Sequence, residues 1–243
     1  MGWRSGIQTV VQTLYPTSCL LCGTTIEGTS GLCSKCWINS PFIAGLVCNS
    51  CGTPLPGHSI EDETCDGCMA TPRPWVAARA CLEYKQNARR LIWGLKYSDR
   101  AEIATAAGSW LLSAVGPILP DNPLIVPIPL HWTRLLRRKY NQSALLSKAL
   151  AREGHFEHAS ELLKRTKRTP SLIGLDFTQR QAFLKGAINV SPKKADTVNG
   201  RNIILVDDVM TTGATLAAAT EACLTQGVKS VSAVFLARTA KND

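Results

Sequence analysis

Two adjacent carboxylates and a threonine-rich turn are the residues of this 243-residue chain best suited to bind a ligand. Asp207 and Asp208 follow residues 203–206, a β-branched and aliphatic run typical of a strand buried on both faces of a parallel sheet. Residues 216–226 then predict a helix that ends at Gly227. The turn between them comprises Thr211, Thr212, Gly213, Ala214 and Thr215. Helix-start N–H groups and hydroxyls can donate to a phosphate, and carboxylates can accept from sugar hydroxyls, which suits a ribose 5-phosphate.

The alternative is a strand-to-helix turn in which the Asp and Thr side chains serve only as caps. Two neighbouring carboxylates repel each other, and a cap needs only one of them, so we favour ligand binding. The segment resembles the phosphoribosyl-diphosphate (PRPP) motif of type I phosphoribosyltransferases. That resemblance implies a ligand bound as PRPP with Mg²⁺.

Helices and short strands alternate from residue 77 onward, which predicts an α/β domain. Residues 124–128 and 230–236 are two further apolar strands, and residues 143–152 predict a helix. We therefore expect a type I phosphoribosyltransferase-like parallel sheet with helices on both faces. Ligands of such sheets bind beyond the carboxyl ends of the strands, where the carboxylate pair is expected to lie.

The domain contains two basic segments, and the first of them leaves the sheet at this predicted edge. Pro127 and Pro129 cannot continue a ladder, so the chain should leave the sheet abruptly and carry four cations with it. These are Arg134, Arg137, Arg138 and Lys139. They suit pyrophosphate or a nucleic-acid backbone, and a solvated basic loop is the alternative. The second segment is interpreted as the start of a mobile loop reaching residue 180. Its cations are Lys164, Arg165, Lys167 and Arg168, which together with Arg134 and Lys139 are the predicted nucleic-acid-binding residues.

The charge is divided unevenly along the chain. The net charge is +9, but residues 1–75 hold 3 Lys and Arg against 5 Asp and Glu, whereas residues 76–243 hold 24 against 13. A basic carboxyl-terminal part implies anionic partners such as phosphates or nucleic acid. Trp93, Tyr97 and Trp132 flank the basic segments and could stack on bases if exposed, although packing in the core or its rim is the commoner role.

Eight of the ten cysteines form four Cys-x-x-Cys pairs, a spacing that predicts two structural zinc sites. The predicted ligands are Cys19, Cys22, Cys33, Cys36, Cys48, Cys51, Cys65 and Cys68. Disulfides and a thioredoxin-like redox pair are the alternatives. Spacing leaves sequential and interleaved pairing open, although short loops favour the sequential one. His58 could replace one thiolate, while Cys81 and Cys223 are expected to be small buried hydrophobes.

These features divide the chain into residues 1–75, an amino-terminal helix with a double zinc-knuckle module, and residues 76–243, a phosphoribosyltransferase-like domain. Residues 1–12 show helical apolar spacing rather than the continuous apolar stretch of a secretory signal. Apolar runs in the sequence fall short of the ~18 residues of a membrane span. We expect a cytoplasmic protein.

The order of these elements resembles the ComF family over nearly the whole chain. The four knuckles precede residues 91–97, Leu-Ile-Trp-Gly-Leu-Lys-Tyr, and then come Val-Pro-Ile-Pro at 126–129, Tyr-Asn-Gln at 140–142 and the PRPP motif. The resemblance implies a phosphoribosyltransferase fused to a zinc finger and associated with natural transformation or with external DNA as a nutrient. It also implies that Asp207, Asp208 and Lys96 are catalytic, while residues 211–215, with Arg137 and Arg138, bind PRPP.

Three positions depart from the family pattern in the region expected to close over the reacting centre. Leu172 or its neighbours replace a usual Gln, Phe183 a usual Asn, and Ile188 a usual Phe. These departures concern catalysis more than binding. The resulting hypothesis is a PRPP-binding protein that handles incoming single-stranded DNA, with DNA-processing proteins as further partners. The alternatives are an active phosphoribosyltransferase on a small nucleobase and a zinc-module adaptor with a vestigial PRPP site.

Overall fold

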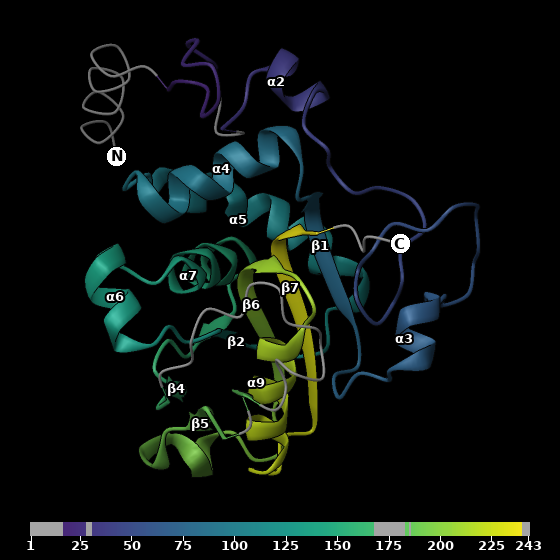
Figure 1. Ribbon diagram of the computed structural model, residues 1–243, viewed down its shortest axis with the longest axis vertical. Helices are drawn as coiled ribbons and strands as arrows, with labels where there is room; N and C mark the ends of the chain where they lie inside the picture. Colours follow the sequence, from purple (N-terminus) through teal and green to yellow (C-terminus); the bar gives the residue numbers. More distant parts are fainter. Residues whose placement is uncertain (1–16, 28–30, 168–182, 185, 240–243) are drawn as a thin grey trace, which may run out of the picture.

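A five-stranded parallel sheet forms the centre of the computed structural model, which describes residues 17–27, 31–167, 183–184 and 186–239 (Figure 1). The strand order is β1-β7-β6-β2-β3, and every neighbouring pair is parallel. The strands are β1 (Ala78–Glu83), β2 (Leu124–Pro127), β3 (Glu157–His158), β6 (Asn202–Met210) and β7 (Ser230–Arg238). The predicted parallel α/β fold is therefore confirmed, and β1 is a strand that the sequence pattern did not reveal.

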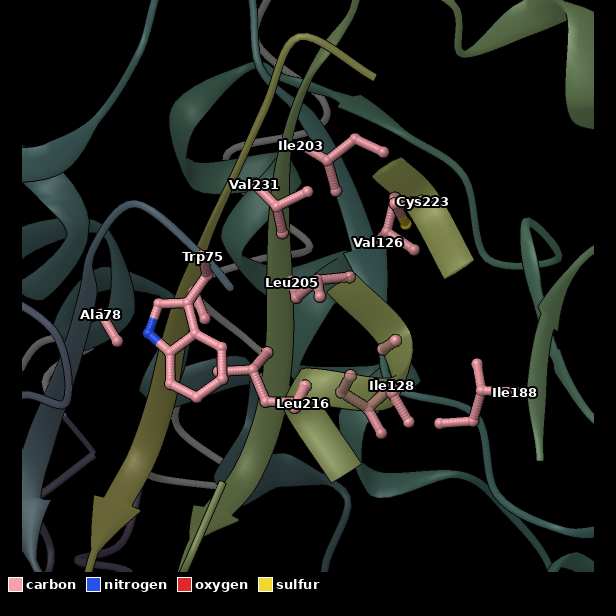
Figure 2. Close-up of a cluster of buried hydrophobic side chains, with 14 of the residues drawn as sticks. Trp75, Ala78, Val126, Ile128, Ile188, Ile203, Leu205, Leu216, Cys223 and Val231 are labelled. Atoms are coloured by element: carbon pink, nitrogen blue, oxygen red, sulfur yellow. The ribbon is translucent and has the colours of Figure 1, made fainter. Parts of the chain in front are cut away.

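Alternate residues of the buried strands face two separate apolar clusters. Ile204 and Val234 pack with the helices α4, α5 and α7, while Leu205 and Phe235 pack with α9 and with cysteines of the zinc module. The helices are α4 (Gln86–Tyr97), α5 (Glu102–Val115), α7 (Gln142–Gly154) and α9 (Ala214–Leu224). Figure 2 shows the second cluster, with Trp75 beside residues of the sheet and of α9. Because both faces of each strand are covered, near-continuous apolar runs are required.

The carboxyl end of β6 extends past its neighbour on one side. β2 pairs with β6 only as far as Pro127 and Val206, whereas β7 pairs with β6 as far as Met210 and Arg238. The predicted strand at 203–206 is therefore too short, because pairing with β7 continues through the two aspartates. With β2 ended by its prolines, Asp207 and Asp208 lie where β6 has a strand neighbour on one side only.

The basic segment after β2 folds into the helix α6 (Trp132–Arg138) instead of a loop. Buried His131 caps this helix, its ring nitrogen accepting a hydrogen bond from the Thr133 backbone N–H at 3.3 Å. The predicted mobile segment begins in a second small sheet, of β4 (Leu163–Arg165) antiparallel to β5 (Ile188–Val190), so the loop interpretation is wrong for Lys164 and Arg165. Residues 168–182, including Arg168 and Leu172, lie outside the described residues.

Two short helices of the zinc module, α2 (Ser34–Ile38) and α3 (Asp66–Ala70), each begin at a knuckle. The remaining elements are the 3₁₀ helices η1 (Gly116–Ile118) and η2 (Pro192–Thr197). The module contacts the sheet directly, since Phe42 bridges to Leu82 and the Ile43 N–H donates to the Cys81 carbonyl at 2.9 Å. The predicted boundary after residue 75 stays a prediction, and the amino-terminal helix expected over 1–12 lies outside the described residues. Among the described residues, helices long and apolar enough to cross a membrane are absent.

Candidate functional site

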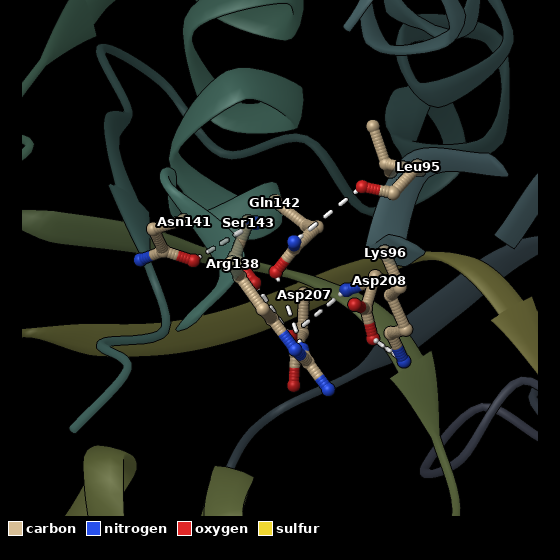
Figure 3. A network of polar contacts seen from close by, with 8 residues as sticks. All are labelled: Leu95, Lys96, Arg138, Asn141, Gln142, Ser143, Asp207 and Asp208. Carbon is tan, nitrogen blue, oxygen red and sulfur yellow. Dashed lines mark hydrogen bonds and ion pairs between the residues drawn. The ribbon is translucent and has the colours of Figure 1, made fainter. Parts of the chain in front are cut away.

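The two aspartates of β6 contact two different helices. Lys96, in the last turn of α4, pairs with Asp208 at 2.8 Å, and both side chains are largely buried, with 18% and 10% of their surface exposed. Ser143, in the first turn of α7, donates its hydroxyl to an oxygen of Asp207 at 2.6 Å. In Figure 3, Lys96 reaches Asp208 from α4 and Ser143 reaches Asp207 from α7. The sheet edge and two helix ends thus meet at one polar site.

Residues 140–142, Tyr-Asn-Gln, fix the positions of α4 and α7 relative to the end of β2 at this polar site. Asn141 caps α7 by accepting from the Ser143 N–H at 3.1 Å, and its amide donates to the Ile128 carbonyl at 3.0 Å just beyond β2. The Tyr140 hydroxyl and the Gln142 amide both donate to the Leu95 carbonyl, at 2.9 and 3.4 Å. Since Leu95 precedes Lys96, the triplet holds the lysine and Ser143 in register with the aspartates. The sequence pattern pointed to the triplet but did not identify Ser143 as a partner of Asp207.

Asp207 is a carboxyl that folding makes harder to ionise. Desolvation, followed by the charge of neighbouring Asp208, raises its pKa from 3.8 to about 7. Hydrogen bonds from Ser143 and from the Asp208 N–H, together with the charge of Lys96, act in the opposite direction. A carboxyl that holds its proton near neutral pH is typical of functional sites, because a bound ligand or cation can shift its charge.

The raised pKa makes the stability of the chain depend on pH. The folded state binds the Asp207 proton more tightly than the unfolded state, so stability should fall as pH rises from about 4 to about 7. Asp207→Asn keeps the side-chain shape and removes the titration. The melting temperature of this variant minus that of the wild type should therefore increase by several degrees between pH 5 and pH 8.

Differential scanning calorimetry without ligand measures this difference. Asp121→Asn is the control, because Asp121 is an exposed acidic residue that contacts Asn202 through its backbone carbonyl. Its melting temperature minus that of the wild type should stay constant over the same pH range. A constant difference for Asp207→Asn as well would contradict the raised pKa.

The predicted phosphate loop, residues 211–215, surrounds a small pocket at the start of α9. The pocket has a volume of about 50 Å³, and Asp207 and residues 209–216 line it together with Phe235. Gly213 has a φ of +84° and is the N-cap of α9, a left-handed conformation that side-chain-bearing residues rarely adopt. The glycine therefore lets the chain turn into α9 beside Asp207, and the helix start lies at the pocket.

Several predicted cations gather near Asp207. Arg165 on β4 and Arg134 on α6 are partly buried, and desolvation lowers the pKa of both guanidinium groups. Repulsion between the arginines lowers these pKa values further. The charge of Arg134 lowers the pKa of Arg165, and the charge of Arg138 lowers the pKa of Arg134. The negative charge of Asp207 acts in the opposite direction and raises the pKa of Arg165. This cluster of like charges beside one acidic pair is suited to a multiply charged anion.

The other predicted basic residues that the structure describes lie at the surface. Arg137 is exposed on α6, Lys164 is exposed on β4, and Lys167 is exposed after β4. Lys139 is exposed and pairs with Asp99, away from the aspartate pair. The structure thus brings Arg134, Arg138 and Arg165 toward the site and leaves these four at its periphery.

Trp93 and Tyr97 form an exposed aromatic pair on α4, whereas packing in the core or its rim was the commoner expectation. Their exposed fractions are 64% and 54%, and their ring centroids lie 4.6 Å apart. The buried face of α4 is taken by Leu91, Ile92 and Leu95, which turns Trp93 and Tyr97 outward. The Arg138 guanidinium lies over the Tyr97 ring at 5.5 Å, and Trp132 at the start of α6 is also exposed. An aromatic and basic surface therefore adjoins the site.

The eight predicted zinc ligands form two Cys₄ sites with sequential pairing. Within each cluster all sulfur atoms lie within 4.8 Å of one another, as tetrahedral thiolate coordination requires. The first cluster is Cys19, Cys22, Cys33 and Cys36, and the second is Cys48, Cys51, Cys65 and Cys68. His58 is exposed and belongs to neither cluster, and Cys81 and Cys223 are buried in the core as predicted. The sites are closed, so they are structural.

Comparisons with known proteins agree with this geometry. A double zinc ribbon family model matches residues 10–69, and a phosphoribosyl transferase domain model matches residues 157–243. The fold and the site therefore define a phosphoribosyltransferase-type domain that carries a double zinc ribbon.

Relatives extend over almost the whole chain. DNA utilization protein YhgH of Escherichia coli K12 is 34% identical over 232 residues, which cover 92% of this chain and 98% of that protein. Competence protein F of Haemophilus influenzae is 29% identical, covering 86% of this chain and 91% of that one. Competence protein ComFC of Bacillus subtilis is 29% identical, covering 85% and 84%. The chain belongs to the ComF family of competence and DNA-utilisation proteins.

Among solved structures, this chain is similar to the hypoxanthine-guanine phosphoribosyl transferase of L. donovani. The match covers 56% of this chain and 71% of that protein. The TM-score is 0.33 and the sequence identity is 19%. The assignment of the fold comes from the sheet topology and the family models.

Proposed function

We propose that the chain binds a 5-phosphoribosyl ligand, PRPP with Mg²⁺, at the carboxyl end of β6. The observation that carries the proposal is the network in which Lys96, Asp208, Asp207 and Ser143 meet beside the pocket of residues 211–215. This arrangement places carboxylates for sugar hydroxyls next to a helix start for a phosphate. The ring of the ribose would lie over Asp207 and Asp208, with its 5-phosphate in the small pocket.

The diphosphate of PRPP would extend toward the basic side of the site. Arg138 and Arg165 offer charge there, and Arg137 can reach in from the surface of α6. Among the described residues, the only groups of three or more metal-ligating side chains are the two cysteine clusters, so a separate protein cage for Mg²⁺ is lacking. Mg²⁺ commonly binds through substrate phosphates and one or two carboxylates, which fits a metal that arrives with the diphosphate.

The same groups would support displacement of pyrophosphate from the anomeric carbon. The bond from that carbon to the diphosphate oxygen would break, pyrophosphate would keep the electron pair, and the acceptor would form the new bond. Lys96 and Arg138 would stabilise the departing charge, while Asp207 and Asp208 would orient the ring. Phe183, where the family pattern has Asn, is exposed. Pyrophosphate release that depends on one particular nucleobase would identify the chain as an active transferase.

Ribose 5-phosphate separates specific recognition from general anion binding. It should compete with PRPP and Mg²⁺ in an equilibrium binding assay, whereas ribose and inorganic pyrophosphate should compete far more weakly. Pyrophosphate competing as well as ribose 5-phosphate would show that only the basic residues bind. In that case the phosphoribosyl assignment of residues 207–215 would be wrong.

We further propose that single-stranded DNA binds in the cytoplasm along the stacking face, which we define as Trp93, Tyr97, Trp132, Arg134 and Arg138. Exposed aromatic rings beside arginines provide stacking and charge neutralisation, the two terms that dominate binding of single strands. The names of the relatives, DNA utilization protein and competence protein, support a role with incoming DNA. DNA-processing proteins are the further partners that such a role implies.

Trp93→Ala should weaken binding of an oligothymidine about tenfold, because stacking of one base contributes roughly 1–3 kcal/mol. Trp37→Ala is the matched control. Trp37 is a tryptophan with 40% exposure that lies in the aromatic cluster with Phe42 and Trp110 and not on the stacking face. Fluorescence anisotropy over a series of salt concentrations measures both affinity and salt dependence.

Wild-type affinity should fall steeply with salt, as expected when several cations contact phosphates. Equal losses in the two variants, or affinity that does not depend on salt, would contradict binding of DNA at the stacking face.

A further inference from the structure

The backbone of the predicted phosphate loop is held from behind by side chains that also contact the second zinc cluster. Three residues make this connection. The side chain of each contacts both the knuckle segment 48–68 and residues 210–213. They are Arg73, Trp75 and Arg238.

Arg238 is the most buried of these three residues, with 2% of its surface exposed. It lies at the carboxyl end of β7, and its Nε donates to the carbonyl of Cys51, a zinc ligand, at 3.1 Å. Its Nη1 donates to the carbonyls of Met210 and Thr211, at 3.2 and 2.6 Å. One guanidinium therefore joins the backbone of the zinc knuckle to the backbone entering the phosphate loop.

Arg73 makes a parallel connection one residue further along the loop. Its Nη1 donates to the Thr212 carbonyl at 3.2 Å, and its side chain also interacts with the zinc ligand Cys68. A cationic side chain beside a metal-bound thiolate helps to orient that ligand, and the interaction depends on the negative charge of the sulfur. The position of Arg73 is thereby coupled to coordination at the second cluster.

Trp75 closes the arrangement through packing. Its indole N–H donates to the Ser50 carbonyl inside the third knuckle at 2.5 Å. The far edge of the same ring lies against Gly213, where an added Cβ would be 3.0 Å from Trp75 Cη2. The turn at Gly213 thus rests on a ring that the zinc knuckle holds in place.

These contacts determine the direction of the amide groups of the loop. The carbonyls of Met210, Thr211 and Thr212 are held by the two arginines, and their peptide bonds are trans. In a trans peptide the C=O and the following N–H point in opposite directions. Fixing three consecutive carbonyls toward the zinc side therefore turns the N–H groups of Thr211, Thr212 and Gly213 away from it.

The first zinc cluster contacts a different part of the molecule. Arg90 on α4 donates to the Leu21 carbonyl at 3.0 Å, and Arg100 donates to the Leu20 carbonyl at 2.8 Å. Cys19 and Leu20 belong to the apolar cluster on the α4 and α5 side of the sheet, whereas Cys48, Cys51 and Cys68 belong to the one with Trp75 and α9. Substitutions beside the first zinc cluster can therefore serve as controls for substitutions beside the second zinc cluster.

We propose that the second zinc cluster is a positioning element of the phosphate loop, acting through Arg73, Trp75 and Arg238. Zinc bound by residues 48–68 keeps the loop amides aimed at the ligand, and loss of zinc there loosens the loop. This inference rests on the proposed function only in naming the ligand as a 5-phosphate. The mechanical link between the second cluster and the loop can be tested without any ligand.

Hydrogen exchange on the full-length, zinc-loaded chain tests that link. In Arg73→Gln, the amides of residues 211–215 should exchange about tenfold faster, because a hydrogen bond from a charged group is lost from the loop. Arg90→Gln removes the same kind of contact at the first cluster and should leave these amides unchanged. Cys65→Ser, which weakens the second cluster, should reproduce the effect of Arg73→Gln, with melting temperature recorded to separate local from global opening.

Binding of PRPP with Mg²⁺ to the same proteins separates the two ideas. We expect about tenfold weaker binding in Arg73→Gln and wild-type affinity in Arg90→Gln. If exchange changes as expected but wild type does not bind PRPP, the positioning role stands and the proposed function fails. If wild type binds PRPP while Arg73→Gln has wild-type exchange and affinity, the positioning role is overturned and the proposed function stands.

Discussion

Stripping zinc from the chain should lower its melting temperature by roughly 20 °C or more. Cys48 and Cys51 are fully buried, and with Cys68 they share one apolar cluster with the sheet strands and α9. Without the metal, four thiols held within 4.8 Å of one another would lose the interaction that keeps them together. Structural zinc contributes on the order of 10 kcal/mol in small domains, so its loss should reach the central sheet.

Zinc content by mass spectrometry, together with calorimetry before and after chelation, measures this effect. Cys223→Ala is the control, because Cys223 is a buried cysteine outside both clusters and its loss should leave two zinc ions per chain. A chain that keeps its melting temperature after both ions are gone would contradict a structural role for the metal.

Lys96→Met should destabilise the chain by about 3 kcal/mol, the usual cost of removing one partner of a buried ion pair. The change leaves Asp208 without its cation, beside an Asp207 that already resists ionisation. Methionine keeps most of the side-chain volume of Lys96, so the loss of charge dominates over the loss of packing. The expected drop in melting temperature is roughly 5–10 °C for a chain of this length.

A double-mutant cycle with Asp208→Asn isolates the pair. Adding Asp208→Asn to Lys96→Met should recover a large part of the lost stability, since an uncharged amide needs no cation. Lys85→Met is the control, because Lys85 is exposed and forms a surface pair with Glu83 that should contribute little. Additive effects of Lys96→Met and Asp208→Asn would contradict a direct interaction.

Features made by consecutive residues could be predicted from the sequence. The aspartates, the threonine-rich turn and the helix after it are contiguous, and their types carry the chemistry directly. The four Cys-x-x-Cys pairs likewise predict two zinc sites, although their sequential pairing is seen only in the folded chain. In these cases local geometry and function are set by the same few residues.

Features made by distant residues could not be predicted in this way. Ser143 contacts Asp207 across 64 positions, and Arg238 contacts Cys51 across 187, so neither pairing leaves a local pattern. The helix α6 was not predicted, because Pro127 and Pro129 indicated only an abrupt exit from the sheet and the cap from His131 is not a common one. Tertiary packing also overrode the expectation for Trp93, which the apolar face of α4 turns outward.

The most direct test of the phosphoribosyl site is a thermal-shift titration of the zinc-loaded chain with PRPP and Mg²⁺, beside Asp208→Asn. A ligand at about 100 times its Kd adds about 2.7 kcal/mol to stability, which corresponds to roughly 5–10 °C here. We expect a shift of that size in wild type and its loss in Asp208→Asn. The absence of a shift in wild type with full zinc content, or an equal shift in both proteins, would contradict a PRPP site at Asp207 and Asp208.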